Sequence, residues 1–236
     1  MIRVARAITA ALCMAVMLAA QARAVDRPTV IELFTAQGCS SCPPAEAALG
    51  VLAQRPDVLA LAFHVDYWDD VGWPDHFQLP TSARRQAQYV RRLKLPVAAT
   101  PQMIVNGRLA LQGSNQDRLN TLLREASAGE PIQLALAGQV LTIDVPALTS
   151  GETCDVILVS YLPQATTHVR RGENAGRDLK EYNIVRSLRV LGSPGPRGAH
   201  WQLSRQSLPP DAERVAVWLQ EAGQGPIIGA TSLALR

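Results

Sequence analysis

The sequence predicts two domains: an α/β domain in the first half of the chain and a small antiparallel β-sandwich in the second. Three observations support this prediction. Short apolar runs alternate with helical periodicity over residues 30–126. A Cys-x-x-Cys motif lies between the first apolar run and the first helical pattern. After residue 129, apolar and polar residues alternate with the period of half-buried strands.

The first half of the chain begins with a strand, a helix and a second strand. Residues 30–34 form a short apolar run typical of a buried strand, and apolar residues then recur at helical spacing over 45–52. Residues 58–65 form the second apolar run, so two parallel strands joined by a crossover helix are expected. The expected order continues with a helix over 81–93, a strand over 102–105, a hairpin turn at Asn106-Gly107, a strand over 109–111 and a helix over 114–126.

The order β-α-β-α-β-β-α is that of a thioredoxin-like domain of the glutaredoxin type. In such a domain, Cys39 and Cys42 lie at the first β-to-α turn. Because the carboxyl ends of parallel strands form the binding edge of a sheet, His64 is expected near the two cysteines. Thr100-Pro101 joins the same edge if its peptide bond is cis.

The second half of the chain follows a turn-rich boundary at residues 128–131, which places the two domains at residues 25–129 and 130–236. Beyond this boundary, short strands with two-residue alternation predict the small β-sandwich. They are expected around residues 141–145, 154–158, 182–190, 215–219 and 227–228.

Residues 1–24 have the pattern of a secretory signal peptide, with Arg3 and Arg6 before a short apolar segment and Ala22-Arg23-Ala24 as the cleavage pattern. The whole chain has 23 basic and 20 acidic residues, and three of the basic ones lie in this segment. The mature chain is therefore neutral, 23 − 3 = 20 against 20, which disfavours nucleic-acid binding. The protein is expected to be periplasmic or secreted, with no membrane span after cleavage.

Two cysteines spaced in this way at a strand-to-helix turn can form a disulfide and exchange it with other thiols. Cys39 comes first and is the candidate nucleophile, whereas Cys42 is the candidate that resolves the mixed disulfide. The start of the following helix would lower the pKa of Cys39, although Pro43-Pro44 removes two N–H donors there. Cys154 shares a strand face with apolar residues and is expected to be buried and inert.

Five further residues complete the candidate site. Glu32 lies on the strand that leads to the cysteines, where it either relays a proton to the resolving thiol or faces solvent. A cis bond before Pro101 would leave Thr100 free to pair with an incoming peptide as an added strand. Trp68 and Trp73 lie in an aromatic, acidic loop that either binds a substrate or packs over the sheet edge.

Six blocks of sequence carry a family resemblance: residues 32–44, 63–69, 100–107, 172–177, 183–187 and 225–230. Together they resemble a secreted, mostly bacterial, thioredoxin-like family known as domain of unknown function 1223. The resemblance implies a thioredoxin-like fold, export, and superfamily roles for Cys39, Cys42 and Pro101. It implies no substrate. Ser40-Ser41 stands where thioredoxin itself has Gly-Pro, which leaves the redox potential open.

Three functions fit these residues. The first is an exported thiol–disulfide oxidoreductase that needs no cofactor and acts on protein or small-molecule thiols and disulfides. The second is a copper-binding protein or metallochaperone with Cys39, Cys42 and His64 as ligands. The third is a non-catalytic binding module with a structural disulfide. The direction of electron flow and the oligomeric state are open at this point. Residues 172–177 are expected to bond among themselves or to contact the first domain.

Overall fold

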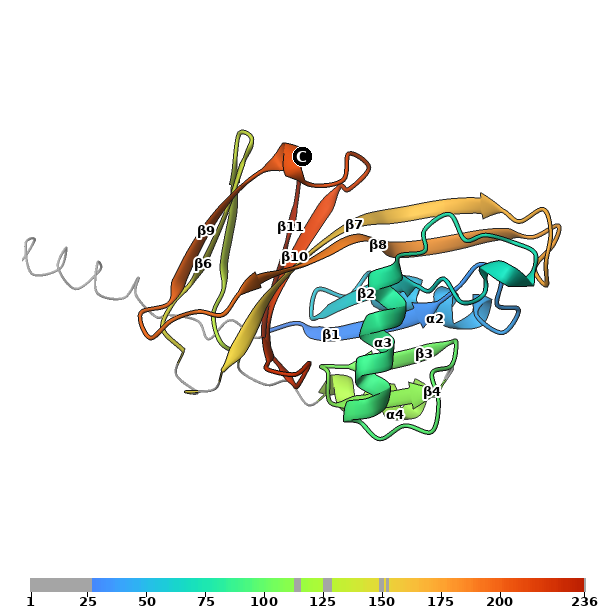
Figure 1. Cartoon of the computed structure of the whole chain (residues 1–236), viewed down its shortest axis with the longest axis horizontal. Helices are drawn as coiled ribbons and strands as arrows, with labels where there is room; N and C mark the ends of the chain where they lie inside the picture. The colour runs from blue at the N-terminus through green and yellow to red at the C-terminus, as the bar shows by residue number, and fades with distance from the viewer. Residues whose placement is uncertain (1–26, 113–115, 125–128, 149–150, 152, 236) are drawn as a thin grey trace, which may run out of the picture.

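The structure is a computed structural model that describes residues 27–112, 116–124, 129–148, 151 and 153–235. It contains two β-sheets (Figure 1). The larger sheet has eight strands in the order β11-β10-β7-β8-β2-β1-β3-β4, and the smaller has three in the order β5-β6-β9. The expected signal peptide over residues 1–24 lies outside the described residues.

The described helices are α2 (Pro43–Leu52), α3 (Pro80–Arg92) and α4 (Gln116–Arg124). Across the described ranges, no helix combines the length and the apolar composition that crossing a membrane requires. The strands are β1 (Thr29–Thr35), β2 (Val58–His64), β3 (Gln102–Val105), β4 (Leu109–Gln112), β5 (Gln133–Ala137), β6 (Val140–Val145), β7 (Cys154–His168), β8 (Asp178–Gly192), β9 (Ala199–Ser204), β10 (Arg214–Glu221) and β11 (Ile227–Ala234).

The predicted fold class is wrong. The elements over residues 29–124 do follow the order β-α-β-α-β-β-α, with β1 and β2 parallel and β1 and β3 antiparallel. The sheet continues past β2, however, because β8 pairs with it in parallel and extends it through β7, β10 and β11. The described chain is a mostly-sheet fold with an eight-stranded mixed sheet and a second, three-stranded one, not a thioredoxin-like domain followed by a separate sandwich.

The physical reason for this difference is the length of β7 and β8, which have 15 residues each. A strand of that length spans about 50 Å. One half of the β7–β8 pair can therefore join β10 while the other half reaches β2, as Figure 1 shows. Alternating residues identify such strands but do not say which sheet they join. The division of the chain at residue 129 stays a prediction.

The helices cover both faces of the larger sheet. On β1, Ile31 and Leu33 pack in a buried cluster with Leu49 of α2 and with α4. Phe34 packs on the opposite face in a cluster with Tyr89 of α3, and α3 crosses that face in Figure 1. The alternation along β1 therefore places one helical layer on each side of the strands that lead to the cysteines.

The three-stranded sheet packs against the other end of the larger sheet. Leu141 and Ile143 of β6 share a fully buried cluster with Val156 and Leu158 of β7 and with Val217 of β10. The opposite end of the β7–β8 pair, where the two strands are joined by a loop, contacts the cysteine turn.

Helix α2 lies close against β8 because residue 50 is glycine. A Cβ atom on Gly50 would lie 2.6 Å from the ring of Tyr182, a distance that no real Cβ atom tolerates. A larger residue would push α2 away from β8. Since Cys42 directly precedes α2, this contact sets the distance between the disulfide and the β7–β8 pair.

A buried ion pair joins β1 to α3. The Glu32 carboxylate is fully buried and accepts hydrogen bonds from two nitrogens of Arg85 and from the Tyr89 hydroxyl. Arg85 also donates to Gln220 of β10 at 2.9 Å. Glu32 therefore neither faces solvent nor lies unpaired behind the cysteines.

We predict that Glu32→Ala lowers the free energy of unfolding by about 3–5 kcal/mol, because it leaves the buried Arg85 guanidinium without its counter-charge. Tyr89→Phe removes a hydroxyl that donates to Glu32 and accepts from Arg85 and Gln220 but keeps the counter-charge, so it lowers the free energy of unfolding less, by about 1–3 kcal/mol. Urea denaturation measures both values. Equal losses in the two variants would contradict the assignment of Glu32 as the counter-charge.

Candidate functional site

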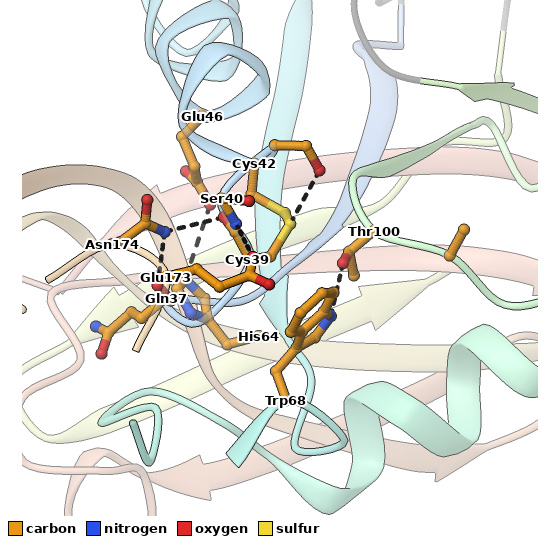
Figure 2. Close-up of a disulfide and its surroundings, with 12 residues drawn as sticks. Gln37, Cys39, Ser40, Cys42, Glu46, His64, Trp68, Thr100, Glu173 and Asn174 are labelled. Carbon is orange, nitrogen blue, oxygen red and sulfur yellow. Dashed lines mark hydrogen bonds and ion pairs between the residues drawn. A yellow bond between two sulfur atoms is a disulfide. The ribbon is translucent and has the colours of Figure 1, made fainter. Parts of the chain in front are cut away.

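The candidate site is built around a closed disulfide between Cys39 and Cys42 at the turn from β1 to α2 (Figure 2). The two cysteines are only 0% and 1% exposed, whereas Ser40 and Ser41 between them are exposed. Any partner of the sulfurs must therefore reach them past neighbouring side chains.

The start of α2 offers the sulfurs no free backbone donor. Pro43 and Pro44 have no N–H, and the N–H groups of Ala45 and Glu46 both bond to the carbonyl of Cys42. The start of α2 therefore has no free N–H group that could stabilise the Cys39 thiolate and lower its pKa as expected. The remaining neighbour is the Ser41 hydroxyl, whose oxygen lies 3.4 Å from the Cys39 sulfur.

The loop between β7 and β8 holds the cysteine turn from outside. The side-chain amide of Asn174 donates to the carbonyls of Gln37 and Cys39 at 2.9 and 3.0 Å. The carboxylate of Glu173 accepts from the N–H of Ser40 at 3.2 Å. The expectation that this loop contacts the first part of the chain is confirmed.

Gln37 is the centre of the buried network below the turn. Its N–H donates to Asp75 at 2.7 Å, and its side-chain amide donates to Thr167 and Glu181 at 3.0 and 2.9 Å. Its side-chain oxygen accepts from the indole N–H of Trp73 at 2.9 Å. Trp73 is buried, so in this structure it braces the turn, and its predicted contact with a substrate is untested.

Trp68 and Thr100 lie on the other side of the disulfide (Figure 2). The Trp68 indole N–H donates to the Thr100 hydroxyl at 2.8 Å, and the ring packs against the buried cluster that contains Cys39. The Thr100-Pro101 peptide bond is cis. The loop that carries Trp68 is thus joined to the segment that was expected to receive a peptide.

A cavity of about 310 Å³ opens beside Cys42. Its inner wall carries Glu46 and His64, and residues 177–182 of the loop and of β8 border it. Cys39 is not among the residues that line it. The lining residues are Thr35, Ala36, Gln37, Cys42, Pro43, Glu46, Ala47, His64, Arg177, Asp178, Leu179, Lys180, Glu181 and Tyr182.

Glu46 and His64 are both buried and both keep unused polar atoms in this cavity. Neither carboxylate oxygen of Glu46 has a hydrogen-bond partner, and neither does Nε2 of His64. These two groups lie 3.9 Å apart, and Nδ1 of His64 lies 2.8 Å from the Asp75 carboxylate. Unpartnered buried polar atoms beside a void point to water, a ligand or a reacting group.

The burial of these groups changes their pKa values. Burial raises the pKa of Glu46 to about 7, although the nearby His64 acts in the opposite direction. Burial by itself would lower the pKa of His64, but Asp75 and the other carboxylates outweigh it and raise the pKa to about 9. Near neutral pH, His64 is therefore protonated and Glu46 is close to half ionised.

The predicted site residues are only partly brought together. The disulfide joins Cys39 to Cys42, and Thr100 and Trp68 lie beside it. The Glu32 carboxylate is instead held by Arg85 and does not line the cavity. The predicted proton relay through Glu32 therefore has no contact that supports it.

The buried carboxyl at the site is instead Glu46, which was not predicted. It follows Cys42 by four residues, so that both side chains lie on one face of the start of α2. That spacing was visible in the sequence. The contributions of Gln37 and Asn174 were not, because they depend on the docking of the β7–β8 loop.

Two further expectations concern metal binding and Cys154. Within the part of the chain that the structure describes, no three His, Cys, Asp or Glu side chains are arranged to hold a metal ion. The copper alternative with Cys39, Cys42 and His64 thus gains no support. Cys154 is a buried free thiol as expected, and burial raises its pKa to about 11.

Glu46 makes stability depend on pH. Between about pH 4.5 and pH 7, the unfolded chain has lost the Glu46 proton while the folded protein keeps it, so the free energy of unfolding falls as pH rises. The total fall from this group is about 3 kcal/mol. His64 adds a second fall between about pH 6.5 and pH 9, where the folded protein keeps a proton that the unfolded chain has lost.

We predict that Glu46→Gln, which keeps the size of the side chain, flattens the fall between pH 5 and pH 7. Urea denaturation of both proteins at three pH values in that range measures the effect. The same pH dependence in both proteins would show that Glu46 does not titrate there.

Comparison with known proteins gives a family but no activity. A family model described as "Protein of unknown function (DUF1223)" matches residues 30–220. No curated protein matches the chain. An X-ray crystal structure of a protein from Agrobacterium tumefaciens is similar at 30% identity and a TM-score of 0.75, covering 88% of this chain and 94% of that one. HBP35 of Porphyromonas gingivalis shares the fold at 12% identity and a TM-score of 0.62, covering 89% of this chain and 76% of that one. The chain belongs to the DUF1223 family of proteins of unknown function.

Proposed function

We propose that the protein exchanges electrons with thiols and disulfides through the Cys39–Cys42 pair. The observation that supports this best is the cavity beside Cys42, where the buried Glu46 carboxyl has no hydrogen-bond partner. Buried polar groups in proteins are normally paired. A carboxyl without a hydrogen bond in the cavity that Cys42 lines, with a pKa of about 7, suits a reaction in which a proton is given or taken near neutral pH.

The chemistry requires two partner thiols. Their oxidation to a disulfide supplies the two electrons that break the Cys39–Cys42 bond, and two protons pass from them to the cysteine sulfurs or to solvent. The Ser41 hydroxyl is placed to donate a hydrogen bond to a Cys39 thiolate. Glu46 lines the same cavity as Cys42 and is the group that we propose exchanges a proton with it. The reverse reaction uses the same groups.

We propose that this exchange takes place outside the cytoplasm. The proposal rests on the signal-peptide pattern of residues 1–24. A closed disulfide also suits a compartment in which disulfides persist.

A purely structural disulfide is the competing function, and the burial of both sulfurs favours it. Against it stands the small size of the ring, since closing so short a loop constrains the unfolded chain little. The cavity is the feature that a structural role leaves unexplained.

We predict that Cys39→Ala and Cys42→Ala each abolish catalytic turnover of a dithiol and a disulfide, because each variant can form only a mixed disulfide. Reduction of a model disulfide followed by absorbance measures the turnover. Cys154→Ala is the control and keeps the activity of the original protein, since that thiol is buried and unpaired. Turnover that survives the loss of either Cys39 or Cys42 would contradict the proposed function.

A further inference from the structure

We infer that the exchange partner is a low-molecular-weight thiol that enters the cavity and attacks Cys42, not Cys39. The inference rests on the proposed function and adds to it the class of substrate and the sulfur that reacts. It follows from which sulfur can be reached, from the size of the space, and from the groups that line it.

Only one of the two cysteines borders open space. Cys42 lines the cavity, and Cys39 does not. Cys39 is fully buried; Trp68 packs against its cluster, and Asn174 holds its carbonyl. A thiol that approaches through the cavity without moving these residues therefore reaches Cys42 first.

The size of the cavity selects small molecules. Its volume of about 310 Å³ is at the lower end of pockets that hold small ligands. Ala47 is exposed and also lines the cavity, so it lies at the opening, together with the exposed Lys180. A cavity of this volume holds a short thiol but no folded protein.

The inner wall provides the proton acceptor that the attack requires. The Glu46 carboxylate takes the proton of the incoming thiol, and the resulting thiolate forms a bond to the Cys42 sulfur. The Cys39–Cys42 bond breaks, and Cys39 leaves as a thiolate beside the Ser41 hydroxyl. A second thiol then gives its proton to the Cys39 thiolate or to solvent, and its thiolate attacks the bound partner's sulfur. The partner departs as a disulfide, and Cys42 leaves as a thiolate that recovers a proton from Glu46.

The first test compares how fast the two cysteines take up glutathione. In Cys39→Ala, oxidised glutathione should add to Cys42 at least tenfold faster than it adds to Cys39 in Cys42→Ala, as measured by mass spectrometry. Ser41 favours the thiolate of Cys39, so a faster Cys42 would reflect access and not acidity. A faster Cys39 would overturn the inference and leave the proposed function standing.

The second test closes the opening. Ala47→Phe should slow reduction of the disulfide by glutathione at least tenfold. The matched control is Val51→Phe, one turn further along α2 at a position that is 71% exposed and outside the cavity, which should leave the rate unchanged. Circular dichroism confirms that both variants fold.

The outcomes separate the two claims. An unchanged rate in Ala47→Phe would overturn entry through the cavity. A disulfide that no thiol reduces in the folded protein, but that glutathione reduces in urea, would instead overturn the proposed function itself.

Discussion

The site depends on one contact: the side-chain amide of Asn174 holds the carbonyls of both Gln37 and Cys39. This contact joins the end of the β7–β8 pair to the turn that carries the disulfide. It also positions residues 177–182 as one wall of the cavity. The close approach of α2 to β8 at Gly50 joins the same pair of strands to the helix that follows the disulfide. Strands that follow the cysteines by more than 110 residues thus complete the site around them.

The buried charged residues form two separate clusters: Glu32 with Arg85, and Glu46 with His64 and Asp75. On the α3 side of the sheet, Glu32 and Arg85 satisfy each other and contribute to stability. Beside the disulfide, Asp75 pairs with Nδ1 of His64, whereas Nε2 of His64 and both carboxylate oxygens of Glu46 have no hydrogen-bond partner. A carboxyl whose pKa is raised to about 7 by burial reduces stability progressively as the pH rises from about 4.5 to 7. Strongly shifted pKa values of this kind cluster at functional sites.

The sequence was sufficient for local structure and insufficient for long-range assembly. The Asn106-Gly107 turn could be predicted because a two-residue hairpin turn requires positive φ angles, which Asn and Gly adopt readily. The observed φ angles are 48° and 65°. The position of the disulfide could be predicted from the apolar run before it and the helical pattern after it. The eight-stranded sheet could not, because alternation along β8 does not identify β2 as its neighbour. The prediction named Glu32 as the carboxyl beside the cysteines and missed Glu46, although Glu46 lies only four residues after Cys42.

The central claim is that the Cys39–Cys42 disulfide reacts in the folded protein. The reduction potential of the pair, measured by equilibration with glutathione buffers, tests this claim most directly. A value above about −300 mV, within reach of cellular thiols, is the result that the account predicts. A value well below that, in a protein that also resists reduction while folded, would identify the disulfide as structural and contradict the account.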